Sequence, residues 1–190
     1  PGTMIFYLSD TTVAGGGLLK NAVAIAGTVA ATYWFLMLVG RFTAGFIANK
    51  ISSKTMVTVT TICAMTLIVF AIMLGKTITV SMPVFTGSSF EMVTVPVAAL
   101  LFVLCGLCTS VMWPCIFNLA TEGLGKYTAA ASGIFMMMVV GGGILPLLQN
   151  FIADNAGYLI SYIIPLIGLA YLCFYAIAGS KNVNKEIPVE

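Results

Sequence analysis

The chain has 190 residues, of which 60% are hydrophobic and only 7% charged, and it contains no histidine. Soluble domains carry about a quarter charged residues, so this composition indicates an integral membrane protein. The formal net charge of +2 is scattered singly between apolar runs, which disfavours a nucleic-acid partner. The absence of histidine removes the commonest general base and metal ligand and disfavours an enzyme.

Apolar runs divide the chain into predicted membrane spans. The first residues, "PGTMIFYL", are typical of the tail of an apolar segment, so we expect a fragment that is truncated at its N-terminus. A hydrocarbon core of about 30 Å needs about twenty helical residues. Five runs are long enough, approximately 21–48, 55–75, 94–118, 130–153 and 157–179, and only short polar connectors separate them. The sequence therefore predicts one helical membrane domain, residues 1–180, followed by a tail, residues 181–190.

Lysines near the span ends predict how the bundle is oriented. Lys50, Lys54, Lys126, Lys181 and Lys185 fall on one side of the predicted membrane, whereas Lys20 and Lys76 fall on the other. Cytoplasmic loops carry the excess of positive charge. We therefore expect a multi-pass protein of the inner cell membrane with its C-terminal tail in the cytoplasm.

The first full span carries a buried cation and a pair of aromatic residues. An arginine at bilayer centre costs about 2.5 to 3.5 kcal/mol on the insertion scale, so Arg41 in "LMLVGRFTAGF" needs an explanation. Either the Arg41 side chain extends to the membrane interface, or it pairs with an anion. For the second case we suggest that Glu122 is the anion and that the two residues form a gate. Gly40 and Gly45 would let a neighbouring helix approach closely. Tyr33 and Trp34 are equally compatible with cavity lining and with core.

The third span ends in "SVMWPCIFNLATEGLGKYT", which is too polar for a lipid-facing helix. At 100° per residue, one stripe holds Gly106, Ser110, Trp113, Phe117 and Thr121, with Pro114 at its edge. Sugars favour this mixture, because their apolar faces stack on indole and their hydroxyls need polar partners. We therefore expect Trp113 to contact a sugar, with help from Ser110 and Asn118. The alternative is a packing kink at Pro114 with Trp113 as interfacial filler.

The fourth span contains "GGGILPLLQ", in which Gly142, Pro146 and Gln149 share a predicted face with Met138 and Leu145. Gln149 is the best amide in the chain for hydrogen-bonding a polar ligand, although a buried amide that links helices is an alternative. The five cysteines all lie in apolar runs and are interpreted as small buried hydrophobic residues. We expect no metal and no cofactor.

Several of these motifs together resemble a known family. They are "GRFTAG" before a basic loop, then "MWPCIFNLATEGLGKYT", "GGGILPLLQ" and "SYIIPLIGLAYLCFYAI". The sequence is similar to the C-terminal half of the fucose/glucose/galactose:proton symporters of the major facilitator superfamily. Its Pro-Leu-Leu-Gln run is more similar to the glucose/galactose branch. The resemblance implies an all-α fold of five full transmembrane helices plus the end of a sixth.

The resemblance also implies a function, namely uptake of a monosaccharide by proton symport with alternating access. Trp113 would lie in the sugar cavity, and Gln149 would hydrogen-bond the sugar. The family's proton-carrying carboxylates belong to the N-terminal half, and we expect none in this chain because its carboxylates lie near helix ends or in loops. The expected partners are a monosaccharide, a proton taken up through the missing half, and the lipid bilayer. Two alternatives are a transporter of another small polar solute and a non-transporting membrane subunit or sensor.

Overall fold

The computed structural model describes residues 2–10, 22–48, 50–75, 78–86 and 88–181. Within these ranges the helices are α1 (Gly2–Ser9), α2 (Ala22–Ile47), α3 (Ser53–Leu74), α4 (Val97–Thr121), α5 (Thr128–Met137), α6 (Gly141–Ala156), α7 (Tyr158–Ser161) and α8 (Ile163–Phe174). Two strands, β1 (Thr79–Phe85) and β2 (Phe90–Pro96), lie between α3 and α4. Short 3₁₀ turns occupy Gly125–Tyr127 and Met138–Val140, and a π-helical turn, Tyr175–Gly179, ends the last helix. The expected all-α membrane fold is confirmed.

All five predicted spans are present as helices long and apolar enough to cross a membrane. Within the described ranges they are Val23–Ile47, Ser53–Leu74, Val97–Thr121, Gly125–Ala156 and Tyr158–Gly179. One boundary is wrong: residues 94–96, predicted as helix, belong to β2 because Thr94 and Val95 pair with Ser81 and Val80. Lys20, Lys76, Lys185 and the tail beyond Lys181, on which the predicted orientation partly depends, lie outside the described residues.

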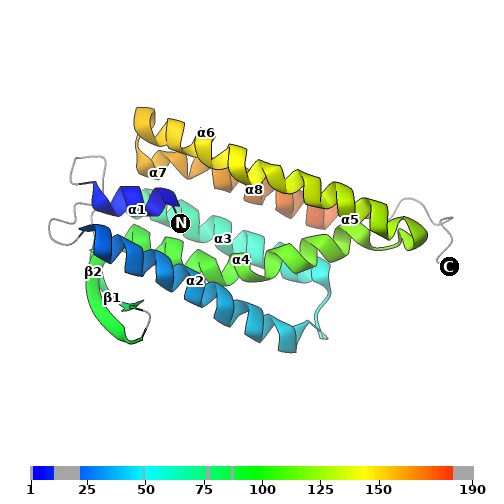
Figure 1. Ribbon diagram of the computed structural model, residues 1–190, viewed down its shortest axis with the longest axis horizontal. Coiled ribbons are helices and arrows are strands. Elements are labelled where there is room, and N and C mark those ends of the chain that lie inside the picture. Colours follow the sequence, from blue (N-terminus) through cyan, green and yellow to red (C-terminus); the bar gives the residue numbers. More distant parts are fainter. Residues whose placement is uncertain (1, 11–21, 49, 76–77, 87, 182–190) are drawn as a thin grey trace.

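The helices form an antiparallel bundle with α4 at its centre (Figure 1). α4 packs against α2 on one side and α3 on the other, and α3 also contacts α8. Phe102 of α4 stacks on Tyr162, which precedes α8, with ring centroids 3.7 Å apart. α1 lies against α2 and buries Met4, Tyr7 and Leu8. The end at which α3 stops and α4 starts is called here the hairpin end.

Local sequence features explain where α3 begins and how polar side chains are hydrogen-bonded within it. Ser52 caps α3, since its Oγ accepts a hydrogen bond from the Thr55 N–H at 3.3 Å. Threonines along α3 donate to carbonyl oxygens in the preceding turn, as Thr61 does to Val57 at 2.7 Å. Such bonds satisfy hydroxyls that have no water partner in a bilayer. Polar residues can therefore sit in these apolar helices without an external ligand.

The turn between α4 and α5 fixes the level of residues on the two helices. Gly123 has φ +76° and Gly125 has φ +48°, a backbone region that favours glycine. The chain therefore reverses direction within a few residues after Thr121; α5 runs back beside the end of α4, and α6 continues in the same direction along α7 and α8 (Figure 1). Residues equally far from this turn lie at similar depths.

Candidate functional site

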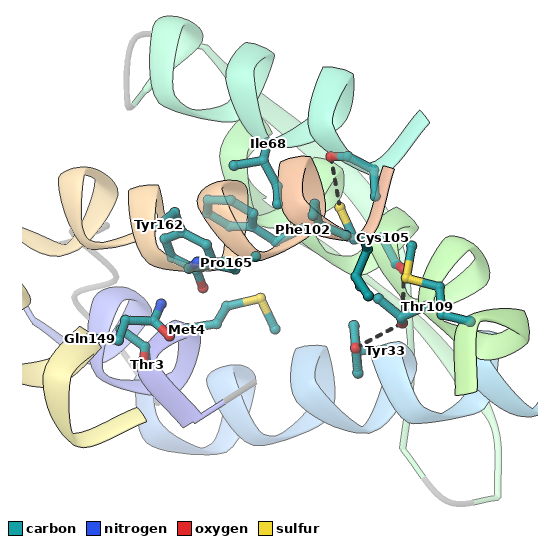
Figure 2. A pocket seen from close by; sticks show the side chains of 15 residues that line it. Thr3, Met4, Tyr33, Ile68, Phe102, Cys105, Thr109, Gln149, Tyr162 and Pro165 are labelled. Atoms are coloured by element: carbon teal, nitrogen blue, oxygen red, sulfur yellow. Dashed lines mark hydrogen bonds between the residues drawn. The ribbon is translucent and has the colours of Figure 1, made fainter. Parts of the chain in front are cut away.

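One opening in the bundle is bounded by α1, α2, α3, α4, α6 and α8 and is named here the Gln149 hollow. It has a volume of about 520 Å³, within the usual range for small-molecule sites. Its polar lining consists of Thr3, Tyr33, Thr109, Gln149 and Tyr162. Figure 2 shows Gln149 beside Thr3 and Met4 at one end and the Tyr33–Thr109 pair at the other. Its remaining lining is mainly apolar.

The Tyr33–Thr109 pair links α2 to α4 inside this hollow. The Tyr33 hydroxyl lies 3.0 Å from Thr109 Oγ1, and Thr109 Oγ1 also lies 3.0 Å from the Cys105 carbonyl oxygen, to which it donates. Gly106 makes the approach possible, because a Cβ there would lie 2.7 Å from the Tyr33 carbonyl oxygen. Sequence reasoning left Tyr33 open between cavity and core, and it missed Thr109. The sequence feature that could have indicated Thr109 is its position one helical turn before Trp113.

A second opening, named here the Arg41 hollow, lies between α2, α3 and α4 away from the hairpin end and also has a volume of about 520 Å³. It brings together five residues singled out from the sequence: Arg41, Gly45, Ser110, Pro114 and Asn118. Two of their polar side chains are engaged within the protein. Ser110 is fully buried and donates to the Leu107 carbonyl oxygen, and Asn118 Nδ2 donates to Ser53 Oγ at 3.2 Å.

Trp113 lies outside both hollows. Its side chain is 44% exposed, and its ring meets Phe135 of α5 edge-on at 5.2 Å. Phe117, one turn further along α4, contacts the same Phe135 ring at 5.4 Å. Trp113, Phe117 and Phe135 are called here the Trp113 patch. Phe135 was missed by sequence reasoning, because only the α4–α5 turn brings it to this level.

The structure does not bring Trp113 and Gln149 together, although the sequence analysis expected both to hold one sugar. Phe135 is level with Trp113, and Gln149 follows Phe135 along α5 and α6. At 1.5 Å per residue, Gln149 lies about 20 Å further toward the hairpin end. This separation follows from the antiparallel run of α4 and α5, and it exceeds the size of a monosaccharide ring.

In the fourth span the helix changes to 3₁₀ at Met138–Val140, before the glycines. This change offsets Met138 from the face that Gly142, Pro146 and Gln149 share within α6. Pro146 lies within α6 and is exposed. A Cβ at Gly142 or at Gly45 would meet nothing within 4 Å, whereas one at Gly40 would overlap Ser110 Oγ. Among the described residues, close helix approach is therefore seen at Gly40 and not at Gly45.

Arg41 and Glu122, the suggested gate pair, are both exposed. Glu122 caps the end of α4, where its backbone N–H donates to the Asn118 carbonyl oxygen at 3.0 Å. Within the part of the chain that the structure describes, no ion pair joins Arg41 to Glu122. Their pairing stays a prediction.

Comparison with known proteins gives partial but consistent matches. A putative glucose/galactose transporter of Helicobacter pylori (strain J99) is 32% identical over 155 residues, which are 79% of this chain and 33% of that protein. The glucose/galactose transporter of Brucella abortus biovar 1 is 46% identical over 77 residues, 40% of this chain and 19% of its own length. The L-fucose-proton symporter of Escherichia coli K12 is 30% identical over 82 residues, 43% of this chain and 19% of the symporter. Over these stretches the chain is similar to members of the fucose/glucose/galactose transporter family.

The matches cover between about a fifth and a third of the length of these family members. No family model matches the chain, and no solved structure matches it. This similarity agrees with the five helices that are long and apolar enough to span a membrane in the described part of the chain.

Proposed function

We infer that this chain forms the C-terminal helical part, residues 1–180, of a secondary active transporter that moves a monosaccharide such as glucose, galactose or fucose across the inner cell membrane. Three relatives carry names that refer to these sugars. Transport proceeds by alternating access, in which two helical halves rock around a site near the bilayer midplane. The protein is not an enzyme, and its partners are the sugar and the lipid bilayer.

The exposed Trp113 is the observation that carries this proposal. α4 is the central helix of the bundle and buries many of its residues, yet it leaves Trp113 44% exposed close to its middle. The edge-on contact with Phe135 at 5.2 Å holds the indole in place while part of it stays exposed. An exposed indole at this depth suits the apolar face of a pyranose ring, and a sugar stacked there lies between this bundle and the rest of the transporter.

Polar groups nearer the hairpin end would serve the same path. Tyr33, Thr109 and Gln149 line the Gln149 hollow and offer hydroxyl and amide groups for sugar hydroxyls. In this arrangement Gln149 contacts the sugar on its way to or from the Trp113 patch rather than in the same bound state. Ser110 and Asn118 support α4 through their bonds to Leu107 and Ser53, and their expected help in holding the sugar stays a prediction.

Coupling to a proton is the mechanism proposed for uphill transport, in line with the name of the Escherichia coli relative. The proton site belongs to the remaining part of the transporter. The predicted orientation, with Lys50, Lys54, Lys126 and Lys181 at the cytoplasmic ends of the helices, places the hairpin end outside the cytoplasm.

Uptake of radiolabelled glucose, galactose and fucose by the full-length protein in proteoliposomes tests the proposal. We expect uptake of at least one sugar, driven by an imposed proton gradient and abolished by an uncoupler. Trp113→Ala should remove most uptake and Trp113→Tyr should keep more of it, because tyrosine retains an aromatic face. Phe174→Ala is the matched control, since Phe174 is a 62% exposed aromatic residue on α8, away from the patch. Wild-type uptake by Trp113→Ala would remove Trp113 from the sugar site.

A further inference from the structure

The β1–β2 hairpin folds back along α2 instead of projecting from the end of the bundle. In Figure 1 it lies beside the first half of α2. The Phe85 N–H donates to Thr32 Oγ1 at 2.7 Å, and Phe85 stacks on Phe35 with ring centroids 5.0 Å apart. Phe90 completes this contact, 5.5 Å from Phe35 and 5.4 Å from Phe85.

Two lengths agree on how deep the hairpin reaches. Thr32 lies nearly three turns into α2, about 15 Å from its first residue at 1.5 Å per residue. Strand β1 has 7 residues, which span about 20 Å in extended form. The tip of the hairpin therefore reaches well within the depth crossed by α2, whose apolar span is Val23–Ile47. It is not a loop lying on the surface of the membrane.

Backbone at this depth cannot face lipid with unpaired polar groups. The sheet has only two strands, so each strand keeps one edge without a ladder partner. On the α2 side, Thr32 satisfies one such group, the N–H of Phe85. In a bilayer, non-helical backbone is tolerated only where it is covered by protein or lines a water-filled cavity.

The two faces of the hairpin carry different kinds of side chain. Met82, Val84 and Val95 are buried against the bundle. The outward face carries Thr79 and a hydroxyl pair, Ser81 Oγ and Thr94 Oγ1, which lie 3.3 Å apart and are exposed. Met92 and Phe90 share this outward face and are exposed. Glu91 is also exposed, but it pairs with Val84 and so lies on the other face of the hairpin, close to the tip. A carboxylate at this depth needs water or a partner, so the hydroxyls and Glu91 are the groups that favour contact with water.

We propose that the outward face of the β1–β2 hairpin and the exposed Glu91 near its tip line a water-filled mouth of the sugar path at the hairpin end of the bundle. The presence of water at this depth is argued from the exposed hydroxyls and the Glu91 carboxylate, whereas its assignment to the sugar path rests on the proposed function. The surface presents hydroxyls and one carboxylate, so it is suited to contact a hydrated, neutral polyol or a cation as it enters.

Thiol accessibility tests this proposal in the full-length protein in sealed proteoliposomes. The native cysteines are replaced by serine, and Met92, which is 67% exposed on the outward face near the tip, is changed to cysteine. The matched control keeps only Cys63. Cys63 is exposed on α3 at a similar depth, among the exposed apolar residues Val59, Ile62 and Phe70. A membrane-impermeant methanethiosulfonate should label Met92→Cys and leave Cys63 unlabelled, because thiols react as thiolates in water.

A second variant pair tests the depth of the hairpin. Thr32→Cys combined with Phe85→Cys should form a disulfide under mild oxidation, whereas Thr32→Cys combined with Ser88→Cys should not. Failure of Met92→Cys to react overturns the proposal. Labelling of Met92→Cys without the Thr32–Phe85 cross-link also overturns it, because the hairpin then stands outside the membrane. Sugar uptake is measured in parallel with the wild-type protein. If uptake is absent, the proposed function fails, while labelling and cross-linking still decide whether the hairpin faces water.

Discussion

Gly40 of α2 lies directly against Ser110 of α4, and this contact sets how closely the two helices approach. A Cβ at position 40 would overlap Ser110 Oγ and would lie 2.8 Å from Ser110 Cβ and 3.1 Å from the Leu107 carbonyl oxygen. Ser110 has no room to move aside, because it is fully buried and bonded to Leu107. A small residue is therefore needed on both helices at this crossing.

Gly40→Ala should lower stability for this reason. Overpacking a tight contact costs about 1–3 kcal/mol, which outweighs the gain of about 1 kcal/mol from replacing glycine in a helix. Thermal unfolding of the purified protein in detergent measures the change. Gly45→Ala is the matched control, since a Cβ there meets nothing within 4 Å, and it should be neutral or slightly stabilising. Adding Ser110→Gly to Gly40→Ala should restore part of the loss, and equal stability of the two alanine variants would contradict the argument.

The Tyr33–Thr109 hydrogen bond gives a second prediction, because it joins α2 to α4 within the Gln149 hollow. Tyr33→Phe and Thr109→Val should each cost about 0.5–1.5 kcal/mol of stability, the usual value of one hydrogen bond. The double variant should cost little more than either single one, since both changes remove the same bond. Thermal unfolding of the three variants checks this. Tyr171→Phe, at a 65% exposed position on α8, should have no effect, and additive losses would show that the two hydroxyls act separately.

The spans and most of their boundaries could be predicted from the sequence, because apolar length is the dominant constraint on membrane helices. The hairpin was missed because its threonines, serines and glycine resembled a polar connector. The pattern that could have indicated it is the alternation of Val80, Met82 and Val84, a period of two residues that is typical of a strand. A sequence pattern this short is interpreted as a loop unless a neighbouring surface, here α2, is known to pack against it.

The candidate site was predicted in composition but not in arrangement. Trp113 and Gln149 are both residues that a sugar site uses, yet the depth of each depends on the turn at Gly123 and Gly125. The interruption at Met138–Val140 further offsets Met138 from the face that Gly142, Pro146 and Gln149 share. Phe135 and Thr109 can be recognised as candidate site residues only from contacts between helices, Phe135 with Trp113 and Thr109 with Tyr33. Helical periodicity on one helix carries no information about such partners.

The distance between Trp113 and Gln149 gives a third prediction. If the sugar contacts them in different bound states, Trp113→Ala and Gln149→Leu should affect kcat/KM for uptake additively within about 0.5 kcal/mol, as distant sites do. Initial uptake rates of the wild type, both single variants and the double variant supply the comparison. Asn155→Leu is a control for the amide, since Asn155 is exposed near the end of α6 and bonds its own helix at the Phe151 carbonyl oxygen. Strong coupling between Trp113 and Gln149 would mean that one sugar touches both.

Arg41 and Glu122 provide the last prediction, because a gate that closes during transport would bring them together although this arrangement leaves both exposed. Arg41→Ala and Glu122→Ala should then impair uptake non-additively, and the exchange of Arg41→Glu with Glu122→Arg should recover activity relative to either single reversal. Stability of the purified protein should change additively, since no ion pair joins the two among the described residues. Arg41→Ala with Lys126→Ala is the matched control, because Lys126 follows the same turn as Glu122 and lies 5.4 Å from the Tyr127 ring. Independent effects of Arg41→Ala and Glu122→Ala on uptake would reject the gate, leaving Arg41 as a residue that snorkels to the interface.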